Sequence, residues 1–137
     1  MKLKTFLILQ SLSLAIYGLA LMFATTPFLA LYGVALSPGA AVALKYFGGV
    51  AAGNAILGWL IRNAAEGVAL RAILFVFAFN WLPAVIFGTL GQLAGAMNAL
   101  GWSTVAIGLL WMVVFGYYWL NLGKPATMRQ PAAPSQS

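Results

Sequence analysis

The stretch VALKYFGGVAAGNAILGWLIRNAAEGVALR, residues 42–71, decides the fold of this chain. Residues 42–61 are almost all apolar or small, and they lead into a short polar segment bounded by Arg62 and Arg71. A helix needs about 20 mostly apolar residues to cross the hydrocarbon layer of a membrane. The stretch therefore predicts a membrane-spanning helix that is followed by a short basic loop.

Three further stretches of the same kind lie at about residues 5–24, 72–91 and 102–121. The chain has 137 residues, of which 64% are hydrophobic and only 6% are charged, whereas soluble domains carry about 25% charged residues. Since no water pairs with the backbone inside a bilayer, each crossing segment must pair its own amide groups, as a helix does. We therefore predict an all-α fold, a four-transmembrane-helix bundle over residues 1–123.

The basic residues predict how these helices are oriented. Six of the seven Lys and Arg residues flank the apolar stretches: Lys2, Lys4, Arg62, Arg71, Lys124 and Arg129. If every stretch crosses the bilayer, these topology anchors all lie on one side, and short loops rich in Lys and Arg stay in the cytoplasm. The pattern predicts cytoplasmic termini, with residues 124–137 as a disordered tail. Because orientation explains the formal charge of +6, we expect no nucleic-acid binding.

Two connections and one proline inside a span carry local signals. Residues 25–41 are too apolar for an open loop and too short to span, so we predict an interfacial turn of helix that ends near Pro38. Pro83 lacks a backbone N–H and predicts a local kink inside the third span. Glu66 follows Arg62 by four residues, a spacing that favours a weak ion pair if the second helix extends past the membrane.

The residue inventory excludes most catalytic chemistry. The chain has no Cys and no His, and Glu66 is its single acidic residue. Disulfides, zinc sites built from Cys or His, haem ligation through His and paired catalytic carboxylates are therefore excluded within it. We predict no catalytic residue, no metal site and no cofactor, and a protein that is not an enzyme.

Small residues in the second span predict close helix packing. They are Gly48, Gly49, Ala52 and Gly53. Small residues four apart, such as Gly49 and Gly53, leave a flat strip that another helix backbone can approach. Two interpretations stay open, namely a contact within the four-helix bundle and a contact with another protein.

Polar residues inside the spans form a candidate intramembrane cluster: Lys45, Gln10, Tyr17, Asn54 and Asn80. Lys45 is the one cation that orientation does not require. Its ammonium group can reach the headgroups along its own stem, or it can contact an anion, a lipid headgroup or an oligomer partner. For the uncharged residues, hydrogen bonds between helices and a path for a ligand or an ion both stay open.

Several short motifs carry a family resemblance. They are Leu31-Tyr32-Gly33, Lys45-Tyr46-Phe47-Gly48-Gly49, Arg62-Asn63, Arg71 and Trp102. In this pattern the chain resembles the small four-helix bacterial membrane proteins of the DoxX-like group. The resemblance implies a multi-pass protein of the bacterial inner membrane, and some members of the group are linked to quinone or thiol redox systems. This chain has no Cys for a thiol-redox role.

Three functions follow in order of preference. The first is a non-catalytic accessory or assembly subunit of a membrane complex, or a homo-oligomer, whose partners are membrane lipid and other transmembrane helices. The second is a small channel or carrier for a neutral or anionic solute. The third is a quinone-linked membrane redox protein, in which a bound cofactor would supply the chemistry.

Overall fold

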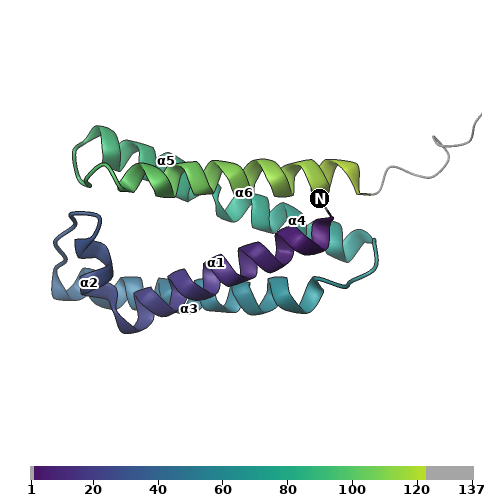
Figure 1. Cartoon of the computed structure of the whole chain (residues 1–137), viewed down its shortest axis with the longest axis horizontal. Helices are drawn as coiled ribbons and strands as arrows, with labels where there is room; N and C mark the ends of the chain where they lie inside the picture. The colour runs from purple at the N-terminus through teal and green to yellow at the C-terminus, as the bar shows by residue number, and fades with distance from the viewer. Residues whose placement is uncertain (1, 123–137) are drawn as a thin grey trace, which may run out of the picture.

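The protein is described by a computed structural model covering residues 2–122, and this part of the chain is helical, without strands (Figure 1). The helices are α1 (Leu3–Phe23), α2 (Thr25–Ala30), α3 (Pro38–Ile61), α4 (Val68–Asn80), α5 (Leu82–Leu93) and α6 (Gly101–Asn121). The predicted 124–137 tail, with Lys124 and Arg129, lies outside the described residues.

Within residues 2–122, four helical segments are long and apolar enough to cross a membrane. They are α1, α3, the run Val68–Leu93 that combines α4 and α5, and α6. The prediction of an all-helical chain with four such segments is confirmed. α3 begins at Pro38, before the expected Val42, because Ser37 caps it: the Ala40 N–H donates to Ser37 Oγ at 3.2 Å. Proline suits a first helical position, where its missing N–H has no partner to lose.

The third segment is interrupted where Pro83 predicted a kink. α4 ends at Asn80 and α5 starts at Leu82, with Trp81 between them. Pro83 has no N–H for the carbonyl of Phe79, and its ring crowds that carbonyl. Helical hydrogen bonding resumes at once, because the Val85 N–H donates to the carbonyl of Trp81 at 3.1 Å. α5 therefore continues the segment after a local break.

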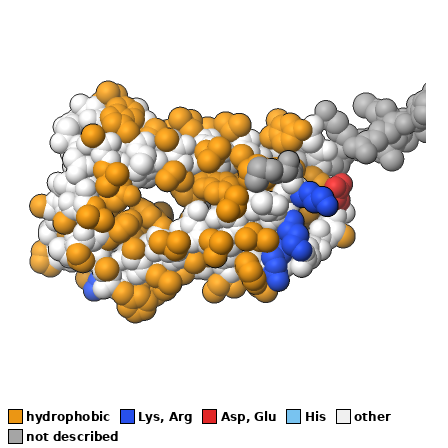
Figure 2. Space-filling view, viewed as in Figure 1, with side chains coloured by type: hydrophobic (Ala, Val, Ile, Leu, Met, Phe, Trp, Pro, Cys, Tyr) orange, Lys and Arg blue, Asp and Glu red, His pale blue; other side chains and the backbone are white. Residues whose placement is uncertain are grey.

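The helices pack as two pairs. α1 lies along α3, and α6 lies along both α4 and α5, whereas α1 and α6 meet over a short length. In Figure 1 the two pairs are close near the N-terminus and diverge toward α2 and α5. Figure 2 shows a gap between them in the diverging half. The molecule is therefore closed at one end and splayed at the other.

The closed end holds the main hydrophobic core. Its buried members come from α1, α4, α6 and the residue after α6: Leu7, Leu70, Leu74, Phe77, Trp111, Phe115 and Leu122. The ring of Phe115 is 5.6 Å from that of Phe77, edge to face, and stacks on Trp111 at 5.6 Å. Offset and edge-to-face arrangements are the favourable geometries for aromatic pairs. This core joins the two helix pairs.

The splayed end is joined by Asn98. Its side-chain Nδ2 donates to the carbonyl of Leu31 at 2.7 Å, and its backbone N–H donates to the carbonyl of Tyr32 at 2.8 Å. Its Oδ1 accepts from the Leu100 N–H at 3.0 Å. Gly33 packs against Asn98 with a φ of +75°, a conformation that glycine adopts without strain. One loop residue therefore ties the α5–α6 connection to the segment after α2.

The α1–α3 contact is a contact between backbones. A Cβ atom added to Gly18 would lie 2.8 Å from the carbonyl oxygen of Gly48 and 2.8 Å from the backbone nitrogen of Ala52. Nearer the closed end, Ser11 Oγ would be 2.6 Å from a Cβ added to Gly58. A side chain added at Gly18 or at Gly58 would therefore collide with the facing helix.

Of the four small residues predicted to pack closely, two contact α1. Gly48 and Ala52 pack against α1, but a Cβ atom added to Gly49 or Gly53 would have no neighbour within 4 Å. The buried positions of α3 are Gly48, Ala51, Ala55 and Gly58, which follow the helical repeat. Gly49 and Gly53 lie about 100° further round the helix and face away from α1.

Candidate functional site

We define the basic end of the molecule as the closed end, where α1 and α4 begin and α3 and α6 end. Lys2 caps α1 and Lys4 lies in its first turn, while Arg62 caps α3 and Arg71 lies in the first turn of α4. Figure 2 shows Lys and Arg side chains gathered at this end, beside one acidic side chain. The anchors in the described residues therefore share one end of the molecule, as their sequence positions predict.

Two of these cations rest on aromatic rings. The guanidinium carbon of Arg62 lies 4.1 Å from the ring centre of Trp59, and Arg62 also donates to the carbonyl of Trp59. The guanidinium carbon of Arg71 lies 5.6 Å from the ring centre of Trp119. The predicted pairing of Arg62 with Glu66 is absent from the structure, because α3 ends at Ile61 and the helical i, i+4 spacing does not continue.

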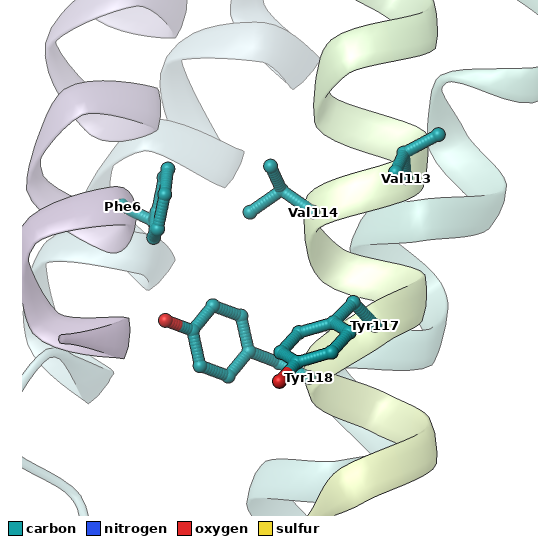
Figure 3. Close-up of a pocket in the computed structure, with 5 residues that line it drawn as sticks. All are labelled: Phe6, Val113, Val114, Tyr117 and Tyr118. Carbon is teal, nitrogen blue, oxygen red and sulfur yellow. The ribbon is translucent and has the colours of Figure 1, made fainter. Parts of the chain in front are cut away.

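A groove lies between α1 and α6 at the basic end. Its volume is about 510 Å³, and it is lined by Phe6, Val113, Val114, Tyr117 and Tyr118 (Figure 3). In Figure 3, Phe6 stands on α1 opposite Val114 and Tyr118 of α6. The rings of Phe6 and Tyr118 are 5.8 Å apart and those of Tyr117 and Tyr118 are 5.5 Å apart. The groove is open to the surface, and the side chains that line it are apolar except for the tyrosine hydroxyls.

A second, more polar recess adjoins this groove. It has a volume of about 360 Å³, and its lining residues are Lys2, Leu3, Glu66, Tyr117, Tyr118, Asn121 and Leu122. The two tyrosines belong to both spaces. Lys2 and Glu66 bring opposite charges to the recess, yet within residues 2–122 no ion pair joins them. We call the two spaces together the α1–α6 site.

The α1–α6 site has the chemistry of an amphiphile-binding site. Its apolar part provides aromatic and branched aliphatic surface, and its polar part provides an ammonium donor, a carboxylate acceptor and an amide. Binding pockets typically combine such apolar walls with a few polar groups that fix orientation. The sequence predicts no site role for Tyr117 or Tyr118, and it indicates Glu66 only as a possible ion-pair partner of Arg62.

The predicted intramembrane polar cluster does not assemble. Gln10 is buried, while Tyr17 is half-buried and packs its ring edge-on against Phe28 at 5.4 Å. Asn54 donates to the carbonyl of Val50 in its own helix at 3.1 Å, and Asn80 is exposed. Among the described residues, no hydrogen bond joins any two of the predicted members.

Lys45 stands apart from the other members of that cluster. It lies in the half of α3 nearer the splayed end, its side chain is exposed, and no described residue forms an ion pair with it. This placement suits a lysine whose stem runs along the helix toward the headgroups.

The buried polar atoms of α1 are a feature that the sequence revealed only in part. Gln10 and Ser11 are 2% and 4% exposed, and Gln10 Oε1 and Ser11 Oγ have no hydrogen-bond partner in the described part of the chain. Gln10 was predicted as an interior residue, but Ser11 was not. Its spacing of seven residues from Gly18, which predicts one shared helix face, was the available signal.

Comparison with protein-family models, curated proteins and solved structures found no match to this chain. The resemblance to the DoxX-like group therefore stays a prediction from the sequence motifs.

Proposed function

We propose that this chain is a non-catalytic, multi-pass integral membrane protein that acts through contacts with other transmembrane helices. It serves either as an accessory or assembly subunit of a larger membrane complex or as a homo-oligomer. The basic end faces the cytoplasm, and the DoxX-like resemblance favours a bacterial inner membrane. Four apolar helices, compatible with an integral membrane protein, support the first part of this proposal.

The observation that carries the proposal is the unoccupied face of α3. Gly49 and Gly53 are four residues apart, and a Cβ atom at either position would meet no atom of residues 2–122 within 4 Å. Ile56, close to the same face, is 62% exposed. The opposite side of α3 already uses small residues to bring α1 into backbone contact. A second helix can approach the Gly49–Gly53 face in the same way, because small residues four apart permit close helix packing.

The experiment introduces bulk on that face and measures assembly. We expect the purified wild-type chain in mild detergent to be an oligomer or to retain a protein partner at a fixed ratio, read by native mass spectrometry. Gly49→Leu combined with Gly53→Leu should abolish that assembly. Gly116→Leu is the matched control, because a Cβ at Gly116 in α6 also meets nothing within 4 Å. A monomeric wild type without partners, or equal assembly of all variants, would overturn the proposal.

A second candidate function rests on the unpaired buried atoms of α1. A channel or carrier for a neutral or anionic solute needs hydrogen-bonding groups inside the membrane, and Gln10 Oε1 and Ser11 Oγ are such groups without partners. Solute uptake into proteoliposomes tests it, with glycerol and chloride as probes. Uptake that is lost in Gln10→Leu and kept in Gln92→Leu would support this candidate, and wild-type uptake at the level of empty vesicles would exclude it.

A further inference from the structure

We propose that the α1–α6 site binds an aminophospholipid, a lipid whose headgroup carries a phosphate and a primary ammonium group. One acyl chain lies in the groove beside Phe6, Val113 and Val114, and the headgroup occupies the recess beside Lys2 and Glu66. This inference does not depend on the proposed assembly function, since it concerns a different surface of the molecule.

The order of chemistry along the site matches the order of chemistry along a phospholipid. The groove is apolar where it is lined by Phe6, Val113 and Val114. It then passes the rings of Tyr117 and Tyr118, which also line the polar recess. Tyrosine is enriched at the depth of lipid headgroups, where one end of its side chain is apolar and the other is hydrated. The boundary between chain and headgroup therefore falls at the two tyrosines.

The charges of the recess specify the headgroup. Lys2 supplies an ammonium for the phosphate, and Glu66 supplies a carboxylate for a primary ammonium. Both line the same recess, but the described part of the structure shows no ion pair within 4.0 Å between them. A headgroup that carries both signs can satisfy both residues at once through charge-assisted hydrogen bonds. Glu66 is the single acid of the whole chain, so its position in this recess gives the site its one negative charge.

Other common headgroups satisfy the recess less well. A glycerol headgroup brings a phosphate for Lys2 but places no cation beside Glu66. A choline headgroup brings a cation without any N–H to donate to the carboxylate. Asn121 adds an acceptor, because its Nδ2 already donates to the carbonyl of Tyr117 at 2.8 Å and its Oδ1 faces no partner in residues 2–122. The recess therefore favours a primary amine that donates several hydrogen bonds.

The test measures lipid selectivity on the purified full chain. Dioleoyl phosphatidylethanolamine, phosphatidylglycerol and phosphatidylcholine are titrated separately, and lipid adducts are counted by native mass spectrometry. We expect phosphatidylethanolamine to bind about threefold to fivefold more tightly than phosphatidylglycerol, as one exposed charge pair permits. Glu66→Gln should remove that preference, whereas Arg62→Gln, a charge change at the same end but outside the recess, should keep it.

Two further variant pairs separate the headgroup from the chain. Lys2→Gln should weaken binding of all three phospholipids by about fivefold, because each carries a phosphate, while Lys45→Gln should have no effect. Val113→Phe should weaken all three lipids equally, and Val50→Phe, an exposed residue outside the groove, should not.

Two results would overturn the inference. The first is equal affinity of the wild type for phosphatidylethanolamine and phosphatidylglycerol, unchanged in Glu66→Gln. The second is a quinone that remains bound after purification and is displaced by none of the phospholipids. Loss of assembly in the Gly49 and Gly53 variant bears only on the proposed function, so the two proposals can fail separately.

Discussion

In one helix pair of this protein small residues make the contact between the helices, and in the other pair large residues do. α1 and α3 pack backbone against backbone, because Gly18 and Gly48 have no side chains to hold the two helices apart. α4 and α6 meet through large side chains, with Phe77 and Phe115 fully buried between them. Lipid is as apolar as leucine, so helices in a membrane gain stability from close packing and hydrogen bonds more than from the hydrophobic effect. Both solutions supply close packing, but they differ in which substitutions break them.

The α4–α6 pair should be the more sensitive to removal of atoms. Phe115→Ala leaves a cavity beside Phe77 and Trp111, and such truncations cost about 3–5 kcal/mol. We expect Phe115→Ala to lower the unfolding free energy more than Gly48→Leu does, as measured by SDS titration in mild detergent. Phe87→Ala is the matched control, because Phe87 is 69% exposed in α5. Equal losses for Phe115 and Phe87 would mean that the aromatic core does not hold this pair.

The α1–α3 pair should be the more sensitive to addition of atoms. Gly48→Leu forces a side chain toward the carbonyl oxygen of Gly18, which would lie 2.8 Å from its Cβ. Overpacking of this kind costs about 1–3 kcal/mol. Gly49→Leu, one residue along, should leave the unfolding free energy of the monomer nearly unchanged, since its Cβ meets nothing within 4 Å. A larger loss of unfolding free energy in Gly49→Leu than in Gly48→Leu would mean that Gly49, and not Gly48, faces α1.

The tie at the splayed end should matter less than either interface. Asn98→Ala removes the hydrogen bonds to the Leu31 carbonyl and from the Leu100 N–H, at about 1 kcal/mol for each. We expect a fall in unfolding free energy of about 1–2 kcal/mol, and more rapid amide hydrogen exchange in residues 31–36. Asn63→Ala, in an exposed loop at the basic end, should change neither quantity. Unchanged exchange in Asn98→Ala would show that this end is held by other contacts.

The amino-acid sequence predicts the elements of this fold better than their contacts. Hydropathy and length are properties of single segments, so the four spans and the break near Pro83 follow from the sequence. The face of α3 that contacts α1 cannot be predicted in this way. Gly48 and Gly49 are equally small, and only the position of Gly18 on another helix selects Gly48. A choice that depends on a distant segment is not encoded in local spacing.

The α1–α6 site is still harder to predict for the same reason. Phe6 and Val114 belong to the first and last spans, and no periodicity in either span shows that they face each other. The sequence does predict that Lys2 and Glu66 lie at the same end of the helices. From the sequence, Glu66 is a possible ion-pair partner of Arg62. That pairing requires a helix that continues beyond Ile61, but α3 ends at Ile61. Glu66 instead lines the recess beside Lys2.

The smallest expected change in unfolding free energy is an increase, whereas the substitutions at Phe115, Gly48 and Asn98 lower it. Gln10 Oε1 is buried in α1 without a hydrogen-bond partner among residues 2–122, and an unsatisfied buried acceptor lowers stability. Gln10→Leu should therefore raise the unfolding free energy by up to about 1 kcal/mol. Gln92→Leu should lower it, because Gln92 Nε2 donates to the carbonyl of Asn98 at 2.9 Å. A destabilised Gln10→Leu would mean that Oε1 has a partner in the purified protein. A bound solute inside the membrane would then account for its burial, as a channel or carrier requires.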